Sequence, residues 1–132
     1  MKPEISIPLH KAHDITPAVL RAGEYCREAG CSENDGRLIS TAVSELANNI
    51  IKYARHGSIR MKEVQSNTRH GIEVVAIDSG PGISDVGRAM KDHYSSSGTL
   101  GLGLPGIKRM MDDFDIQSTR GEGTRIVARK WI

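Results

Sequence analysis

The chain has 132 residues and a mass of 14.4 kDa, the size of one domain and not of two. With 38% hydrophobic and 26% charged residues, it is too apolar for a disordered chain. Its longest strictly aliphatic stretch, Val74–Ile77, is far shorter than the roughly 20 residues of a membrane span. A net charge of +2 without any basic tract gives no reason to expect a nucleic-acid partner.

Two cysteines, Cys26 and Cys31, are too few for a disulfide framework, and their spacing is not the C-x-x-C of a zinc or redox site. No charged and then apolar leader precedes Ile5, so we expect no signal peptide and a cytoplasmic location. No repeat or low-complexity linker interrupts the sequence, which predicts a single domain over residues 1–132.

The N-terminal third of the sequence predicts a strand and a helix. Apolar residues alternate with polar or small ones over Ile5–Leu9, which is typical of a strand. Asp14 or Thr16 can then cap a helix with an apolar stripe, and Gly30 is a suitable stop.

The clearest helix of the sequence follows, over residues 33–54. Ser32 and Asp35 resemble a capping box at its start, with Asp in place of the usual Glu. Apolar residues recur along it at three- and four-residue steps, so one face should lie against a sheet, and we expect Gly57 to end it.

The remaining sequence predicts four strands and two helices. In chain order they are strands 58–65 and 72–78, a short helix 84–92, a helix that starts near Pro105, and a hairpin of strands 114–119 and 124–132. Helices occur too rarely between strands for a parallel doubly wound sheet. We therefore expect an α/β (α+β) two-layer sandwich, with a mixed, mostly antiparallel sheet covered on one face by helices.

Several standard signatures are absent. The sequence has no Gly-Lys pair, which excludes a P-loop, and it lacks H-R-D, D-F-G, H-E-x-x-H and G-x-S-x-G. Residues 101–106 match G-x-G-x-x-G, but residues 95–100 before them cannot form the buried strand of a dinucleotide-binding fold. The glycines still precede a helix whose first turn contains Pro105, and free N–H groups there make an anion site.

Polar residues at one end of the long helix form a candidate site. Glu45 and Asn49 are four residues apart, which offsets them by only about 40° around the helix axis, and Lys52 shares their face. Glu45 and Lys52 alone are also typical of a solvated helix face. Asn49 is harder to explain in that way, because it neighbours apolar residues of a helix that should be mostly buried.

Two glycine-containing turns complete the candidate site. Asp78-Ser-Gly80-Pro-Gly82 follows an apolar strand; it can be a simple tight turn, or its carboxylate can accept a hydrogen bond from an amine such as that of adenine. Gly121-Glu-Gly-Thr124 is, on its own, a hairpin turn. It is the occurrence of all these features in one order that points to a nucleotide site.

That order of motifs resembles the Bergerat-fold (GHKL) ATPases. Residues 45–53 are similar to the N box of that superfamily, 78–82 to its G1 box, 101–104 to its G2 box and 121–124 to its G3 box. Within the superfamily, Ser44–Ala47, Tyr94–Gly98 and Ala128–Trp131 resemble the RsbT-type serine/threonine switch kinases of the bacterial stressosome. The SpoIIAB-like anti-sigma kinases are more distantly similar.

The resemblance implies a role for each matching residue. Asn49 matches a magnesium ligand, Glu45 the general base, Lys52 a phosphate-contacting residue and Asp78 the adenine-reading carboxylate. Thr124 would act near Asp78 through a bridging water. The remaining ATP-binding positions that the motifs imply are glycines and one leucine: Gly80, Gly82, Gly101, Leu102 and Gly103. Residues 84–104 match the ATP lid of the family.

By resemblance, we expect a Mg-ATP-dependent protein serine/threonine kinase whose substrates are STAS-domain partner proteins in a stressosome-like, partner-switching module. Once released, it would activate a downstream effector enzyme such as a phosphatase. The main alternative is an anti-sigma factor that sequesters a sigma factor and phosphorylates its antagonist. A sensor histidine kinase fragment is disfavoured, because only about 30 residues precede the N-box helix. A non-catalytic regulator is disfavoured by the presence of Glu45, Asn49 and Asp78.

Overall fold

The elements of the fold come from a computed structural model that describes residues 1–83 and 103–132. In chain order they are β1 (Ile5–Leu9), η1 (Ala12–Asp14), α1 (Ile15–Glu28), α2 (Glu33–Asn49), η2 (Ile50–Ala54), β2 (Gly57–Ser66), β3 (Arg69–Asp78), α4 (Gly103–Met110), β4 (Asp113–Thr119) and β5 (Gly123–Trp131). The helix predicted over 84–92 and nearly all of the predicted lid, 84–104, lie outside the described residues.

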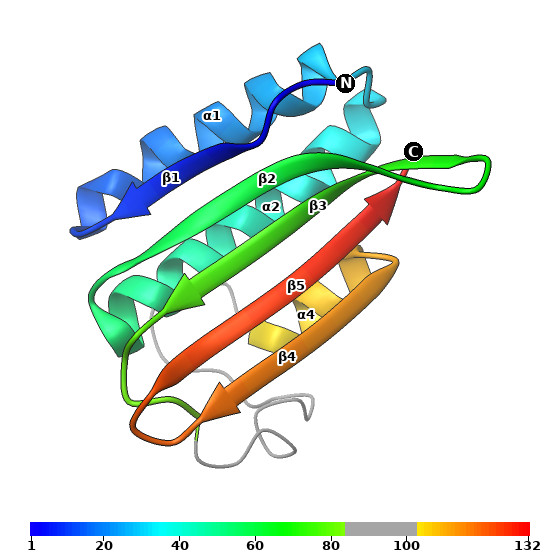
Figure 1. Ribbon diagram of the computed structural model, residues 1–132. Helices are drawn as coiled ribbons and strands as arrows, with labels where there is room; N and C mark the ends of the chain where they lie inside the picture. The colour runs from blue at the N-terminus through cyan, green and yellow to red at the C-terminus, as the bar shows by residue number, and fades with distance from the viewer. Residues whose placement is uncertain (84–102) are drawn as a thin grey trace.

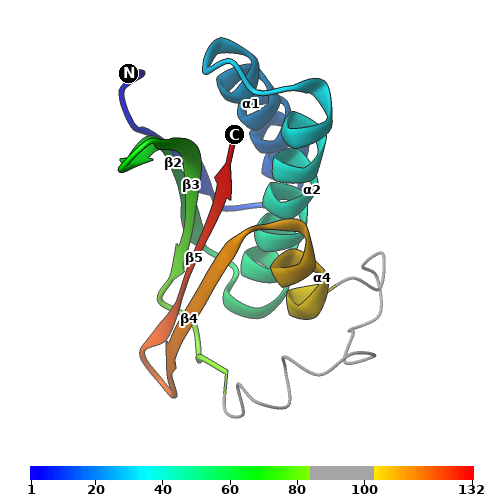
Figure 2. The same cartoon turned by 90° about the vertical axis from the view of Figure 1, so that its right-hand side faces the viewer.

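The five strands form one sheet in the order β1-β2-β3-β5-β4 (Figure 1). Every pairing in it is antiparallel. Figure 2 shows α1, α2 and α4 together on one face of this sheet. The two-layer α/β sandwich expected from the sequence is therefore confirmed, and its described strands are antiparallel throughout.

The core lies between the sheet and the helices. Alternate residues of the strands point inward, so that Ile59 and Met61 of β2 are completely buried together with Val74 of β3. They meet the apolar stripe of α2, which includes Ile39 and Leu46. The sheet thereby holds α2 in a fixed orientation above the ends of β2 and β3.

The predicted end of the first helix and the predicted start of the second are confirmed. Gly30, with φ of +90°, follows α1, and the N–H of Cys31 donates to the carbonyl of Cys26 at 3.0 Å, as in a Schellman motif. The Ser32 hydroxyl accepts from the N–H of Asp35 at 3.1 Å and caps α2. None of the helices in the described ranges is long and apolar enough to cross a membrane.

The long helix differs from its prediction at the C-terminal end. It is α-helical only to Asn49 and continues as the π-helix η2, which the N–H of Arg55 closes with a bond to the carbonyl of Ile50 at 2.8 Å. Arg55, with φ of +71°, ends the helix, so the prediction that Gly57 ends it is wrong. Gly57 begins β2, where a Cβ would lie 2.5 Å from the Ile77 carbonyl oxygen.

Candidate active site

Glu45 and Asn49 lie on one face near the C-terminal end of α2. The Glu45 side chain is 2% exposed, and its Oε2 has no hydrogen-bond partner among the described residues. Burial raises the pKa of this carboxyl group, because the charged form loses its hydration. Asn49 is half-buried at the last position of the α-helix. A buried polar atom without a hydrogen-bond partner, near the half-buried Asn49, indicates a side chain that interacts with a ligand.

Asp78 is the last residue of β3 and lies between two neighbouring strands. It pairs with Gly57 on β2 and with Thr124 on β5. Its Oδ1 accepts the N–H of Gly80 at 2.9 Å, which fixes the carboxylate against its own turn. This cross-strand pairing makes Asp78 and Thr124 direct neighbours.

Ser118 on β4 joins this group and was not predicted from the sequence. Its hydroxyl lies 2.8 Å from the Thr124 Oγ1, accepts the N–H of Ile83 at 2.7 Å and lies 3.3 Å from the carbonyl oxygen of Gly123. It thus connects the turn after Asp78 with the β4–β5 hairpin. A serine in an alternating strand carries no signal of its own, and only the register Ser118↔Thr124 reveals its role.

Three segments that are far apart in the sequence meet at this end of the sheet. A Cβ on Gly80 would lie 2.5 Å from the Cβ of Ala54, so the Asp78 turn packs directly against η2. Gly123, with φ of +129°, packs on the Asp78 carbonyl. The N–H of Gly121 donates to the carbonyl of Pro81 at 2.8 Å. A side chain larger than hydrogen at Gly80 or Gly123 would separate these segments.

Of the other predicted residues, the structure describes Lys52, Gly82 and Gly103. Lys52 is exposed on η2, with its Nζ 5.7 Å from the centre of the Tyr53 ring. Gly82 has φ of +78° in the turn after Asp78, and Gly103, with φ of +54°, is the first residue of α4, which contacts α2. Gly101 and Leu102 lie outside the described residues.

This arrangement fits an adenine nucleotide and a divalent cation. The Asp78 carboxylate has acceptor capacity beyond its bond to Gly80 and can receive an exocyclic amine. The amide oxygen of Asn49 is a hard ligand suited to Mg²⁺ when phosphate oxygens supply most of the others. Glu45, with its raised pKa and unpartnered oxygen, is suited to accept a proton from an attacking hydroxyl.

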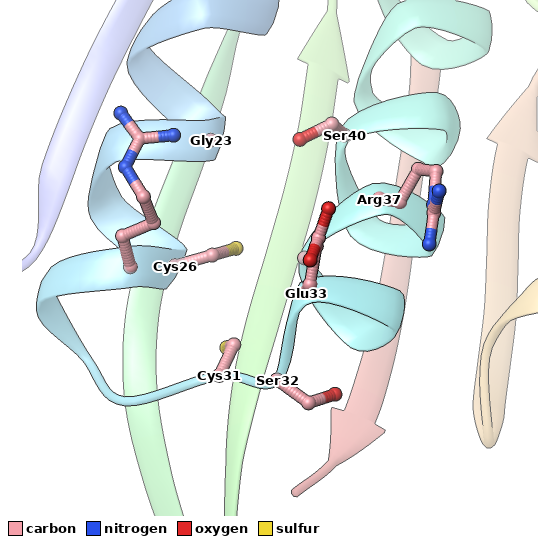
Figure 3. A pocket seen from close by; sticks show the side chains of 9 residues that line it. Gly23, Cys26, Cys31, Ser32, Glu33, Arg37 and Ser40 are labelled. Atoms are coloured by element: carbon pink, nitrogen blue, oxygen red, sulfur yellow. The ribbon is translucent and has the colours of Figure 1, made fainter.

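A separate cavity of about 620 Å³ lies between α1 and the N-terminal half of α2 (Figure 3). Cys26 and Ser40 extend from the two helices toward this space. Burial, and then the neighbouring Cys31, raises the pKa of the Cys26 thiol to about 12, so it is a protonated packing group at neutral pH. Of the predicted nucleotide-binding residues that the structure describes, none lines this cavity.

Comparisons with known proteins show which family and which relatives the chain is similar to. Residues 8–130 match the family described as "Histidine kinase-like ATPase domain". The chain is 44% identical over 119 residues to the serine/threonine-protein kinase RsbT of Bacillus subtilis (strain 168), covering 90% of each protein. It is 34% identical over 100 residues to the anti-sigma F factor of Thermoanaerobacter sp. (strain X514), covering 71% of this chain and 68% of that protein. Among solved structures, a mycobacterial sensor histidine kinase, MprB, has the same fold, with a TM-score of 0.57 and 17% identity over 99% of this chain and 97% of that one.

Proposed function

The chain belongs to the histidine kinase-like ATPase domain family and is an ATP-dependent serine/threonine protein kinase, and on this basis we propose that it phosphorylates STAS-domain proteins. The setting that we propose is a bacterial partner-switching module of the stressosome type. Phosphorylation of the partner releases the kinase, which then activates a downstream effector enzyme such as a phosphatase. The 44% identity to a serine/threonine kinase over nearly the whole chain supports this assignment.

The observation that carries the proposal is the buried Glu45 beside Asn49. An ionised carboxylate with an unpartnered oxygen destabilises a fold, because its desolvation is not compensated. A binding module that only traps nucleotide has no need of such a group. A phosphotransferase does, because the group can orient the acceptor hydroxyl and take its proton as the new phosphate ester forms.

The remaining residues bind and orient the nucleotide. Asp78, held by the Gly80 N–H, reads the adenine edge, and Thr124, fixed by Ser118, lies beside it. Asn49 holds the magnesium ion, and Lys52 contacts phosphate. Mg²⁺, when bound, neutralises charge on the phosphate oxygens. Gly80, Gly82, Gly101, Leu102 and Gly103 complete the binding surface that we propose.

The test is phosphotransfer from γ-labelled ATP to purified STAS-domain proteins of the source organism, followed by identification of the labelled amino acid. We expect label on serine or threonine of at least one of these proteins. The matched control is Glu45→Gln, which keeps the shape of the side chain and removes the base. Absence of transfer to every STAS protein, with folded and ATP-binding kinase, would refute the proposed substrate class.

The similarity to an anti-sigma F factor favours a second candidate, an anti-sigma factor that sequesters a sigma factor and phosphorylates its antagonist. The two candidates differ in whether a sigma factor binds directly. Co-purification with each sigma factor of the source organism, in the presence of Mg-ATP, separates them. A stable one-to-one complex that a STAS protein dissolves would favour the anti-sigma factor.

A further inference from the structure

Six basic side chains gather beside the candidate active site, on the β1 and β2 side of the molecule. They come from the segment after β1 and from the end of the long helix: His10, Lys11, His13, Lys52, Arg55 and His56, here called the cationic rim. All six are exposed. Their closeness follows from the sheet register, in which Leu9 pairs with Gly57, and from the His10 and His56 rings, whose centres are 5.9 Å apart.

The rim has little negative charge of its own. Asp14, the carboxylate within it, accepts the N–H groups of His10 and Lys11 at 2.9 and 3.0 Å and lies 3.7 Å from His13 Nε2. These bonds, the backbone ones first, lower the pKa of Asp14, so it remains a charged part of the turn. Counted over its own six residues and Asp14, all of which the structure describes, the rim therefore has three permanent cations, Lys11, Lys52 and Arg55, and one carboxylate that local N–H groups already occupy.

The rim is continuous with the candidate active site. Ala54, between Lys52 and Arg55, contacts Gly80 in the Asp78 turn, and Gly57, next to His56, contacts Asp78 itself. Lys52 and Arg55 of the rim also follow closely along the chain from α2, the helix that carries Glu45. Arg55 also has φ of +71°, and its N–H donates to the Ile50 carbonyl at 2.8 Å, so its backbone position is set by the end of the helix.

We propose that the cationic rim is the docking surface for an acidic face of the protein whose serine or threonine is phosphorylated. The inference rests on the proposed function, because it takes the substrate to be a folded protein. Complementary charge at such a rim speeds encounter and selects the partner, and salt screens it. An acidic surface close to the acceptor hydroxyl is the partner chemistry that the rim fits.

The test measures binding of STAS-domain proteins to the whole kinase with Mg-ATP analogue, at about 50 and 300 mM salt. The variant is Lys11→Glu with Arg55→Glu, which leaves Lys52 and the proposed catalytic residues unchanged. The matched control is Arg27→Glu with Arg37→Glu, two exposed arginines near the cavity at the other end of α2. Thermal unfolding and ATP affinity are measured for all of them.

We expect the rim variant to bind its partner at least about fivefold more weakly at low salt and to lose most of the salt dependence. The control variant should bind like the unmodified chain. Replacing acidic residues of the partner's docking face with lysine should restore binding to the rim variant. Unchanged affinity in the folded rim variant would overturn the proposal, whether or not phosphotransfer occurs.

The docking and kinase proposals can fail separately. Rim-dependent binding of a STAS protein without any phosphotransfer would refute the kinase substrate and leave the docking surface standing. If no STAS protein binds or is phosphorylated, both proposals fail. Duplex DNA is included as a second probe, and rim-dependent binding of DNA alone would show that the surface serves a nucleic acid and overturn the proposal.

Discussion

Glu45 is the residue at which we expect activity and stability to oppose one another. Its raised pKa means that the folded chain disfavours the ionised form relative to the unfolded chain. The folded state thus binds a proton at Glu45 more readily than the unfolded state does. The ionised side chain therefore lowers the free energy of unfolding at neutral pH, and this loss is relieved as pH falls toward the raised pKa. A group that costs stability and serves no structural bond is typical of an active site.

We predict that Glu45→Gln raises Tm at pH 7 and lowers phosphotransfer by about 10²- to 10⁴-fold, the usual contribution of a general base. The difference in Tm between variant and unmodified chain should shrink as pH is lowered toward 4.5, because protonated Glu resembles Gln. Calorimetry at several pH values and a single-turnover assay measure the two effects. Transfer near the normal rate would show that Glu45 is not the base.

We propose that Asp78 determines which nucleotide base the site accepts. Its fixed carboxylate offers an acceptor to the amino group of adenine, whereas guanine presents a carbonyl at the same edge. We predict that ATP and ADP bind at least about tenfold more tightly than GTP and GDP, since an unpaired buried acceptor is costly. Asp78→Asn should reduce this preference and keep the bond to Gly80. Equal affinities of the unmodified chain for ATP and GTP, measured by calorimetry, would remove Asp78 from this role.

Among the elements, the junction of η2, the Asp78 turn and the β4–β5 hairpin depends on close backbone contact. A Cβ at Gly57 would approach the Ile77 carbonyl and the Ile50 side chain, at 2.5 and 2.7 Å. We predict that Gly57→Ala lowers the free energy of unfolding by about 1–3 kcal/mol and weakens ATP binding. Equilibrium denaturation in urea measures the first effect.

The matched control for that substitution is Gly36→Ala, in the first half of α2. A Cβ there meets only the Cβ of Cys26, at 3.7 Å, which is an ordinary contact. Removing a glycine from a helix stabilises it by about 0.5–1 kcal/mol, so this variant should be more stable with unchanged ATP binding. If both variants lose stability equally, close packing at Gly57 is not the cause.

The elements themselves could be predicted from the sequence where periodicity and caps agree. The Ser32 cap, the stop at Gly30 and the five strands follow from local patterns, and the structure contains each of them. The π-helical turn could not be predicted, because the apolar spacing of α2 continues through Ile50 and Tyr53. Arg55 could not be predicted to end the helix, because a positive φ is uncommon for residues other than glycine.

In the candidate site, the sequence indicates those residues whose side chains are chemically reactive and that belong to a recognisable motif. Glu45, Asn49 and Asp78 were found in this way, and the structure places Asp78 against η2, next along the chain from α2. Ser118 could not be predicted as part of the site, because its role arises from pairing with Thr124 and from accepting the N–H of Ile83, which is distant in the sequence. Contacts between strands do not appear in a local pattern.

At the scale of the whole molecule, we expect the bound nucleotide to connect the helical layer to the sheet and so to stabilise the fold. Asn49 belongs to α2, Asp78 to β3 and Thr124 to β5, so a nucleotide bound by these residues, as we propose, would contact both layers. Binding to the folded state alone, at 100 times Kd, adds about 2.7 kcal/mol. We predict that Mg-ATP raises Tm by roughly 5–12 °C.

Asn49→Ala serves as the comparison for this thermal shift. Without the magnesium ligand, Mg-ATP should give a much smaller rise in Tm, while the shift with metal-free ADP should be nearly unchanged. Differential scanning calorimetry measures the four shifts in Tm, for the unmodified chain and for the variant with each of the two nucleotides. An equal loss of both shifts would mean that Asn49 supports the fold of the site and does not hold the ion.

The π-turn of η2 also constrains how the chain can change in length. Its bond from Arg55 N–H to the Ile50 carbonyl spans five residues where an α-helix spans four, so it accommodates one residue more than an α-helical turn would. Deleting one residue from 50–54 would rewind the turn and pull on Gly57, which has no room to move. Evolution can therefore exchange side chains in this segment far more easily than it can insert or delete a residue.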